Sequence, residues 1–209
     1  MLMNTVRNKA LLLDRDGVIN TEKGYVHRRQ DFHFREGIFD LCRAAQILRY
    51  LPVVVTNQAG IARGYYTESE FGELTDWMLQ EFAQHGVSIA RVYYCPYHPV
   101  HGIGKYKYDS ADRKPKPGML LQAQTDLNLD LTASILIGDK LSDIEAGTAA
   151  GVGTNILLCS SAAGVADQQC LCHFANSLDD IRRRFFSTLN DDESRSRESW
   201  SSHVSCPFD

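Results

Sequence analysis

The chain has 209 residues, of which 44% are hydrophobic and 23% charged, and its formal net charge is −4. This composition fits a globular domain with a substantial core and argues against a disordered, collagen-like or coiled-coil chain. The balance of 22 basic and 26 acidic residues gives no reason to expect nucleic acid or a membrane as a partner.

The start of the chain is polar, and no apolar run reaches the ~18 residues that a membrane-spanning helix needs. A secretory signal would also have a longer apolar core. We therefore expect a cytoplasmic protein in which the six cysteines stay reduced rather than form a disulfide framework.

Short apolar runs that end in polar or glycine residues predict strands buried on both faces of a sheet. The predicted strands, in chain order, are Lys9–Leu13, Leu51–Val55, Ile89–Tyr94, Ser134–Ile137 and Thr154–Leu158.

Between these strands lie segments whose residue pattern predicts helices. The predicted helices are Gly37–Tyr50, Thr67–His85, Gly118–Asn128 and Ser142–Ala150. The second of them begins with Thr67-Glu-Ser-Glu70, a capping-box sequence. Alternating strands and helices predict an α/β fold, with a mainly parallel central sheet flanked by helices. In such sheets, ligands bind beyond the carboxyl ends of the strands.

The long polar connections Asn20–Glu36 and His98–Lys116 are interpreted as active-site loops. After Leu189 the chain is polar and aperiodic. We predict one domain over residues 1–188 and a disordered tail over residues 189–209.

Asp14 and Asp16 lie two residues apart, directly after the first predicted strand and before Gly17. One carboxylate can act as a nucleophile while the other transfers protons. A hard cation such as Mg²⁺ would relieve their mutual repulsion. Taken alone, the two aspartates could equally be a solvated turn.

Further polar groups follow other predicted strands. Thr56 and Asn57 end the second, Asp139 and Asp143 follow Ser134–Ile137, and a basic segment covers residues 113–116. Carboxylates, a metal ion and cationic side chains at one edge suit phosphoryl transfer.

Four motifs together resemble the haloacid dehalogenase (HAD) superfamily of aspartyl-phosphate phosphatases. They are Asp-x-Asp-Gly at 14–17, Thr-Asn at 56–57, Lys-Pro at 114–115 and Gly-Asp-x-x-x-Asp at 138–143. Longer blocks, among them Thr56–Gly64 and Arg113–Met119, resemble the sugar bisphosphate phosphatases of its histidinol-phosphatase subgroup, over residues 8–160. The resemblance implies a Rossmann-like HAD fold without a large cap domain.

The resemblance also implies residue roles. Asp14 would be the nucleophile and Asp16 the acid and base, while Thr56 and Lys114 would stabilise the transferring phosphoryl group. Asp14, the backbone carbonyl of Asp16, and Asp139 would hold Mg²⁺. The implied substrate-binding residues are Glu22, Lys23, Gly24, Tyr25, Asn57, Gln58, Ala59, Arg113 and Lys140.

The implied reaction is removal of the 7-phosphate of a heptose 1,7-bisphosphate, which leaves a 1-phosphate for nucleotide-heptose and lipopolysaccharide synthesis. Histidinol phosphate, or another small phosphomonoester, is the alternative substrate. A catalytically silent phospho-ligand binder is a third hypothesis, which the full set of catalytic residues disfavours. The expected partner is a small phosphorylated sugar, and the expected state is a monomer.

Many members of the subgroup bind a structural zinc through Cys-x-His and Cys-x-Cys. Here only Cys95 remains, and Tyr97, Ser110 and Asp112 stand at the other positions. A single thiolate cannot make a tetrahedral site, so we predict that the zinc is absent. We expect packing of Tyr97, Tyr106 and Tyr108 to hold the loop instead. An alternative metal set combines Cys95, His98 and His101 with Asp109 or Asp112.

Overall fold

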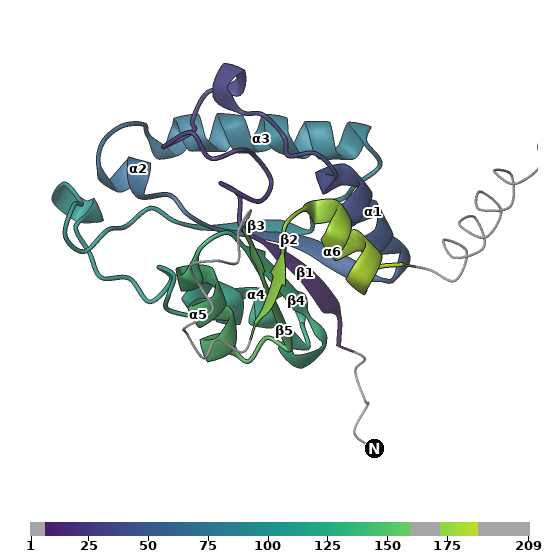
Figure 1. The fold of residues 1–209 in the computed structure, drawn as a ribbon. Coiled ribbons are helices and arrows are strands. Elements are labelled where there is room, and N and C mark those ends of the chain that lie inside the picture. Colours follow the sequence, from purple (N-terminus) through teal and green to yellow (C-terminus); the bar gives the residue numbers. More distant parts are fainter. Residues whose placement is uncertain (1–6, 160–171, 188–209) are drawn as a thin grey trace, which may run out of the picture.

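The computed structural model describes residues 7–159 and 172–187 (Figure 1). The predicted tail over residues 189–209 lies outside the described residues, and so do Cys170 and Cys206. Among the described cysteines, Cys42, Cys95 and Cys159 form no disulfide. No helix in these ranges is long and apolar enough to cross a bilayer.

Six strands of the described chain form one parallel sheet in the order β3-β2-β1-β4-β5-β6. They are β1 (Lys9–Leu13), β2 (Tyr50–Asn57), β3 (Arg91–Cys95), β4 (Ile135–Gly138), β5 (Thr154–Leu158) and β6 (His173–Ala175). The five predicted strands are present at nearly the predicted positions. The parallel sheet with flanking helices confirms the predicted α/β fold.

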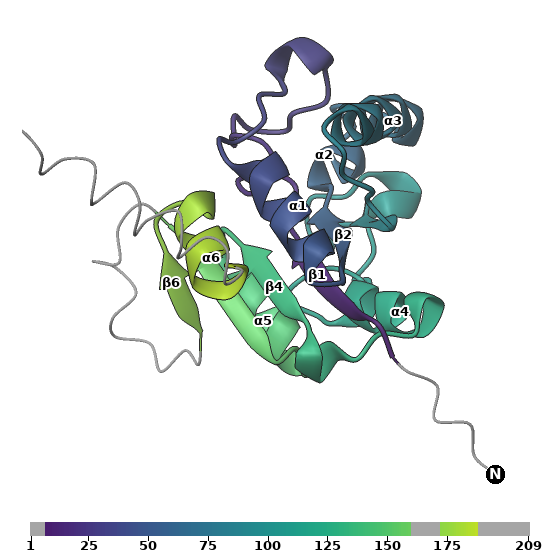
Figure 2. The same cartoon turned by 90° about the vertical axis from the view of Figure 1, so that its right-hand side faces the viewer.

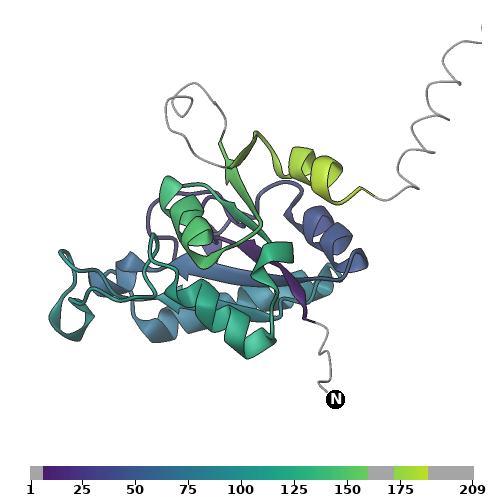
Figure 3. The same ribbon diagram turned by 90° about the horizontal axis from the view of Figure 1, so that it is seen from below.

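Alternate residues of β1 face the two helical layers. Leu11 and Leu13 belong to a core cluster with α1 (Ile38–Ile47), α3 (Glu68–Gln84) and α6 (Leu178–Phe185). Ala10 and Leu12 belong to a second cluster with α4 (Gly118–Leu127) and α5 (Leu141–Ala150). Figure 2 shows α1 and α6 beside each other, and Figure 3 shows α4 and α5 on the face that lies below the sheet in Figure 1. Burial on both faces explains why β1 is a continuous apolar run.

Local sequence explains where several elements begin. The predicted capping box of α3 is present, because the Thr67 side chain accepts from the Glu70 backbone N–H and the Glu70 carboxylate accepts from the Thr67 backbone N–H. The predicted helix Gly37–Tyr50 is too long, since α1 ends at Ile47 and Arg49 turns the chain into β2 with φ +62°.

Three elements were not predicted: α2 (Ala59–Ala62), β6 and α6. The first two are too short to show a period. The start of α6 could have been found, because Ser177 caps the Asp180 backbone N–H at 3.1 Å, a contact typical of a helix N-terminus. Short helical turns η1 (Arg29–Asp31), η2 (Gly104–Tyr106) and η3 (Leu131–Ala133) complete the described chain.

Candidate active site

The turn after β1 places the two motif aspartates at the carboxyl edge of the sheet. The Asp14 N–H donates to the Ile137 carbonyl at 3.0 Å and so continues the ladder between β1 and β4. The Arg15 carbonyl then accepts N–H groups from Val18, Ile19 and Asn20, which closes a tight turn. Gly17 has φ +92°, and a Cβ there would lie 2.1 Å from Asp139 Oδ2. Only glycine allows the Asp139 carboxylate to approach this turn.

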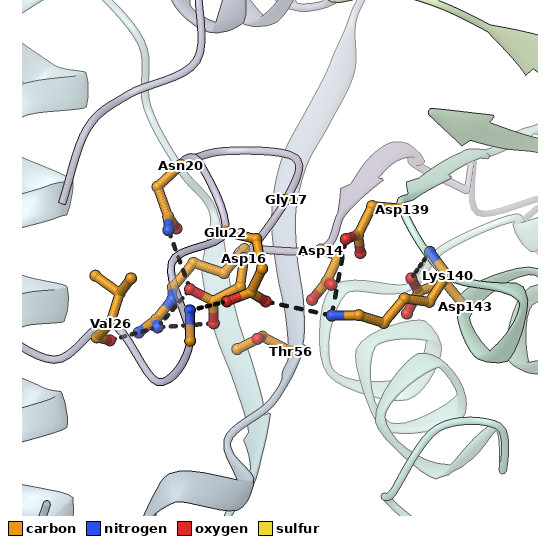
Figure 4. Close-up of polar contacts among 12 residues, drawn as sticks. Asp14, Asp16, Gly17, Asn20, Glu22, Val26, Thr56, Asp139, Lys140 and Asp143 are labelled. Carbon is orange, nitrogen blue, oxygen red and sulfur yellow. Dashed lines mark hydrogen bonds and ion pairs between the residues drawn. The ribbon is translucent and has the colours of Figure 1, made fainter. Parts of the chain in front are cut away.

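Two further carboxylates lie beside Asp14: Asp139 directly follows β4, and Asp143 is in the first turn of α5. Oxygens of Asp14, Asp139 and Asp143 all lie within 4.8 Å of one another (Figure 4). Lys114 Nζ enters this group from the long polar connection, 2.9 Å from Asp14 Oδ1 and 2.6 Å from Asp143 Oδ1. The same ammonium group donates to the Val55 carbonyl at 2.8 Å. One buried cation therefore faces three carboxylates, which we call the aspartate cluster.

The electrostatics of the aspartate cluster follow from this excess of negative charge. Burial raises the pKa of Asp14 to about 7, Lys114 opposes the rise, and Asp143 and Asp139 add to it. Burial also raises the pKa of Asp139. Burial alone would lower the pKa of Lys114, but Asp14 and Asp143 raise it above its usual value, so the lysine stays charged. The cluster is short of positive charge even with Lys114 in place.

A divalent cation fits this site on its donor chemistry. Asp139 Oδ1 is buried and has no hydrogen-bond partner in the described structure. Both oxygens of Asp143 have partners, because Oδ1 faces Lys114 Nζ and Oδ2 accepts the Lys140 backbone N–H at 3.0 Å. Asp14 and Asp139 are thus better placed than Asp143 to serve as ligands of a hard cation.

Asp16 lies on the other side of the turn, near Asn20 and Val26 (Figure 4), in a set of hydrogen-bond donors. Arg15 Nη2 contacts both of its carboxylate oxygens at 2.8 and 2.7 Å and donates to the Val26 carbonyl at 2.7 Å. Asn20 Nδ2 donates to Asp16 Oδ1 at 3.1 Å, and Gln58 Nε2 donates to Oδ2 at 3.0 Å. Arg15 is 1% exposed. We call these groups the donor set of Asp16.

The segment after β2 supports both sides of the site. Thr56 is buried at the end of the strand, and its hydroxyl accepts from Gln58 Nε2 at 2.9 Å. Asn57 uses both ends of its amide on the backbone of Lys114, donating to the carbonyl at 3.0 Å and accepting the N–H at 3.1 Å. Asn57 therefore fixes the chain from which the Lys114 side chain reaches the aspartate cluster.

A cavity of about 690 Å³ opens over this edge of the sheet. Among the residues predicted from the sequence, those that line it are Asp14, Asp16, Glu22, Gly24, Tyr25, Asn57, Gln58, Ala59, Arg113, Lys114 and Lys140. Lys23 is exposed and does not line the cavity. Thr56 is buried and does not line it either, and Asp139 lines a different cavity of about 890 Å³.

The cavity also has walls that the sequence reasoning missed: Tyr66, Pro115 and Ser142. Tyr66 lies two residues after the end of the block Thr56–Gly64, and this proximity was the only available signal. The cis peptide bond between Lys114 and Pro115 belongs to the same wall.

The loop that carries zinc in many members of the subgroup is held here by aromatic packing. The Tyr97 ring centroid lies 6.1 Å from that of Tyr106 and 5.6 Å from that of Tyr108, as predicted. Ser110 accepts the Asp112 backbone N–H at 3.1 Å.

Among the described residues, the side chains of the aspartate cluster converge closely enough to hold a metal ion, and those of Cys95, His98 and His101 do not. The absence of zinc stays a prediction, and stoichiometric zinc in the purified protein would contradict it.

Comparison with known proteins identifies the class. A family model described as HAD-hydrolase-like matches residues 111–180, which include Lys114, Asp139 and Asp143. The fold also resembles a solved D,D-heptose 1,7-bisphosphate phosphatase from B. bronchiseptica, determined with magnesium and phosphate. That match has a TM-score of 0.72 and 25% identity, over 84% of this chain and 96% of the other. The fold is the Rossmann-like HAD fold of these phosphatases, as predicted.

Similarity to individual proteins identifies the family within this class. The chain is 59% identical over 154 residues to a D-glycero-alpha-D-manno-heptose-1,7-bisphosphate 7-phosphatase from Burkholderia mallei, over 74% of this chain and 82% of the relative. It is 54% identical over 149 residues to the corresponding beta-heptose enzyme from Vibrio cholerae, over 71% and 80%. The chain belongs to the family of heptose-1,7-bisphosphate 7-phosphatases and is a phosphoric monoester hydrolase.

Proposed function

We propose that this enzyme removes the 7-phosphate of D-glycero-D-manno-heptose 1,7-bisphosphate and releases heptose 1-phosphate. The observation that carries the proposal is the aspartate cluster with Lys114, of which Asp14, Asp143 and Lys114 line the cavity. The names of the relatives support the heptose substrate. The product would feed the synthesis of nucleotide-activated heptose for lipopolysaccharide or another surface glycan.

Asp14, Asp139 and the backbone carbonyl of Asp16 would hold Mg²⁺. The unpartnered Asp139 Oδ1, the raised pKa of Asp14 and the magnesium in the B. bronchiseptica structure support this assignment. When bound, the ion would neutralise the carboxylates and the phosphoryl oxygens so that an anion can approach the nucleophile.

In the first step, an oxygen of Asp14 attacks phosphorus in line, and the bond from phosphorus to the sugar oxygen breaks. Asp16 gives its proton to that leaving oxygen, and an aspartyl phosphate forms on Asp14. In the second step, Asp16 takes a proton from water as the water attacks phosphorus, and the bond from phosphorus to the Asp14 oxygen breaks. Inorganic phosphate leaves, Asp14 is regenerated as a carboxylate, and Asp16 is again protonated. Lys114 and the Thr56 hydroxyl stabilise the phosphoryl oxygens in both steps.

The rest of the cavity would hold the sugar and its second phosphate. Glu22, Tyr25 and Ala59 lie on its walls, and Arg113 and Lys140 supply positive charge. Lys140 Nζ is 3.4 Å from Glu22 Oε2 and 3.7 Å from Asp139 Oδ2, which places it between the sugar side and the aspartate cluster. A cytoplasmic location, a monomeric state and the lack of nucleic-acid or membrane partners stay predictions.

A steady-state comparison of substrates tests the proposal. Purified enzyme with Mg²⁺ should show a higher kcat/KM for the α- or β-heptose 1,7-bisphosphate than for histidinol phosphate. Relatives of both anomeric specificities are similar to this chain, so both anomers belong in the assay. Equal or faster hydrolysis of histidinol phosphate or unrelated phosphomonoesters would contradict the heptose assignment.

A further inference from the structure

The Gln58 side chain makes its hydrogen bonds within the protein, because both amide hydrogens and one acceptor site of its oxygen have protein partners. Its Nε2 donates to Asp16 Oδ2 at 3.0 Å and to Thr56 Oγ1 at 2.9 Å, and an amide nitrogen carries only two hydrogens. Its Oε1 accepts from the Tyr66 hydroxyl at 2.5 Å. The backbone N–H of Gln58 donates to the Cys95 carbonyl at 2.8 Å, so the residue is fixed at both ends.

Tyr66 decides which end of the Gln58 amide faces Asp16. Because the Tyr66 hydroxyl donates to Oε1, the amide nitrogen is directed toward the Asp16 carboxylate. If the amide rotated by half a turn, an amide oxygen would face a carboxylate oxygen, and two acceptors would repel each other. Gln58 is 1% exposed and Tyr66 5% exposed, so water could not easily replace the lost contacts.

The Tyr66 ring is itself held in place by its neighbours. A Cβ on Gly60 would lie 2.1 Å from Tyr66 Cε1, so the ring occupies the space that a side chain at position 60 would need. His27 stacks on the ring with centroids 5.0 Å apart and an interplanar angle of 8°. Tyr66 also belongs to a small core cluster with Ile61 and Phe71.

We infer that Gln58 and Tyr66 are positioning residues that hold the Asp16 carboxyl in line with the leaving oxygen, rather than sugar ligands. The inference rests on the proposed function, in which Asp16 is the acid and base. It replaces the substrate-binding role that the sequence suggested for Gln58.

The leaving group gives a readout that a purely structural role would not affect. A sugar alkoxide needs the Asp16 proton as the bond from phosphorus to oxygen breaks, whereas p-nitrophenolate leaves without one. A displaced Asp16 therefore slows the first step for a sugar phosphate and barely affects p-nitrophenyl phosphate. The ratio kcat/KM isolates this step, because it covers events up to release of the leaving group.

The first experiment compares Gln58→Met and Tyr66→Phe with wild type on heptose 1,7-bisphosphate and on p-nitrophenyl phosphate. General acid catalysis contributes about 10²- to 10⁴-fold, and displacement of the acid should remove part of it, about tenfold. We expect this tenfold loss in kcat/KM for the sugar substrate and less than a twofold loss for the aryl phosphate.

Tyr94→Phe is the matched control, because it also removes one tyrosine hydroxyl, which bonds to Glu68 at 2.8 Å. It should leave the ratio of the two substrates unchanged. Gly60→Ala should shift that ratio as Tyr66→Phe does, because it displaces the ring without removing a polar group. Circular dichroism and thermal unfolding establish that each variant is folded.

A double-mutant cycle completes the test. With phenyl phosphate as substrate, Gln58→Met should lower kcat/KM in the wild-type background and have no further effect in an Asp16→Ala background. Equal losses on both leaving groups, or full additivity with Asp16→Ala, would overturn the inference alone. An Asp16→Ala enzyme as active as wild type on the heptose substrate would overturn the proposed function with it.

Discussion

The two aspartates of the Asp14-Arg15-Asp16 segment are two residues apart but lie in opposite electrostatic surroundings. Asp14 shares one buried lysine with Asp143, and Asp139 adds a third carboxylate nearby, so negative charge is in excess around Asp14. Asp16 is surrounded by donors from Arg15, Asn20 and Gln58. The excess of negative charge in the aspartate cluster favours cation binding, and the donor set orients the Asp16 carboxyl group. These surroundings fit the proposed roles of Asp14 as nucleophile and metal ligand and of Asp16 as acid and base.

The largest effect is expected when the charge of Asp14 is removed, which tests the excess of negative charge in the aspartate cluster. Asp14→Asn should lower kcat by at least about 10⁴-fold, because it removes the nucleophile. Thermal unfolding of the metal-free variant should nevertheless show no loss of stability at pH 8, since the substitution removes a buried negative charge that burial disfavours and that Asp143 and Asp139 repel. A clear drop in the melting temperature would contradict the excess of negative charge described for the cluster.

The second test removes the only buried cation of the cluster. Lys114→Met should lower kcat by about 10²- to 10³-fold, because a preorganised positive charge on the phosphoryl oxygens is lost. It should also destabilise the metal-free protein, since Asp14 and Asp143 then lie buried without Lys114.

Lys116→Met is the control, two residues further on, because its Asp109 partner is exposed. It should change neither activity nor stability by much. Equal effects of the two substitutions would show that Lys114 has no special role.

The third test uses pH and metal. The pKa of Asp14 rises from 3.8 to about 7 on folding, so the unfolded state gives up this proton at a lower pH. Stability of the metal-free protein should therefore fall as the pH rises from about 4 to about 7, and then level off. Mg²⁺ binds the ionised carboxylates and should raise the melting temperature more at pH 8 than at pH 5.

Asp14→Asn is the control for this pH effect and should flatten the pH dependence of the metal-free protein. The Mg²⁺-induced shift is measured by thermal unfolding with and without the metal at both pH values. A shift of the same size at pH 5 and pH 8 would argue against metal binding at the aspartate cluster.

The smallest expected effect is at the rim of the cluster. Lys140 is half-exposed, and its contacts with Glu22 and Asp139 are long, at 3.4 and 3.7 Å. Lys140→Met should raise the KM for the bisphosphate about fivefold or less, in line with the weak energies of exposed ion pairs. The free energy of unfolding should change by no more than about 0.5 kcal/mol. A large fall in kcat would place Lys140 among the reacting groups instead.

Much of the fold could be predicted because β1, β2 and β4 are buried on both faces, and strands buried in this way consist of short, continuous apolar runs. The capping box of α3 likewise fixes its start through neighbouring residues alone. Elements such as β6 and α2 could not be predicted. They have three and four residues, and their positions depend on contacts with distant parts of the chain.

By itself, the sequence determined which groups could do chemistry, since Asp14, Asp16 and Asp139 follow buried strands whose carboxyl ends meet at one edge of a parallel sheet. Only the tertiary structure decided how those groups differ. The Asn57 side-chain amide holds the Lys114 backbone where its ammonium group reaches Asp14. The Tyr66 hydroxyl orients the Gln58 amide toward Asp16. These contacts join residues far apart in the chain or set the rotation of one amide, and neither a spacing nor a composition records such geometry.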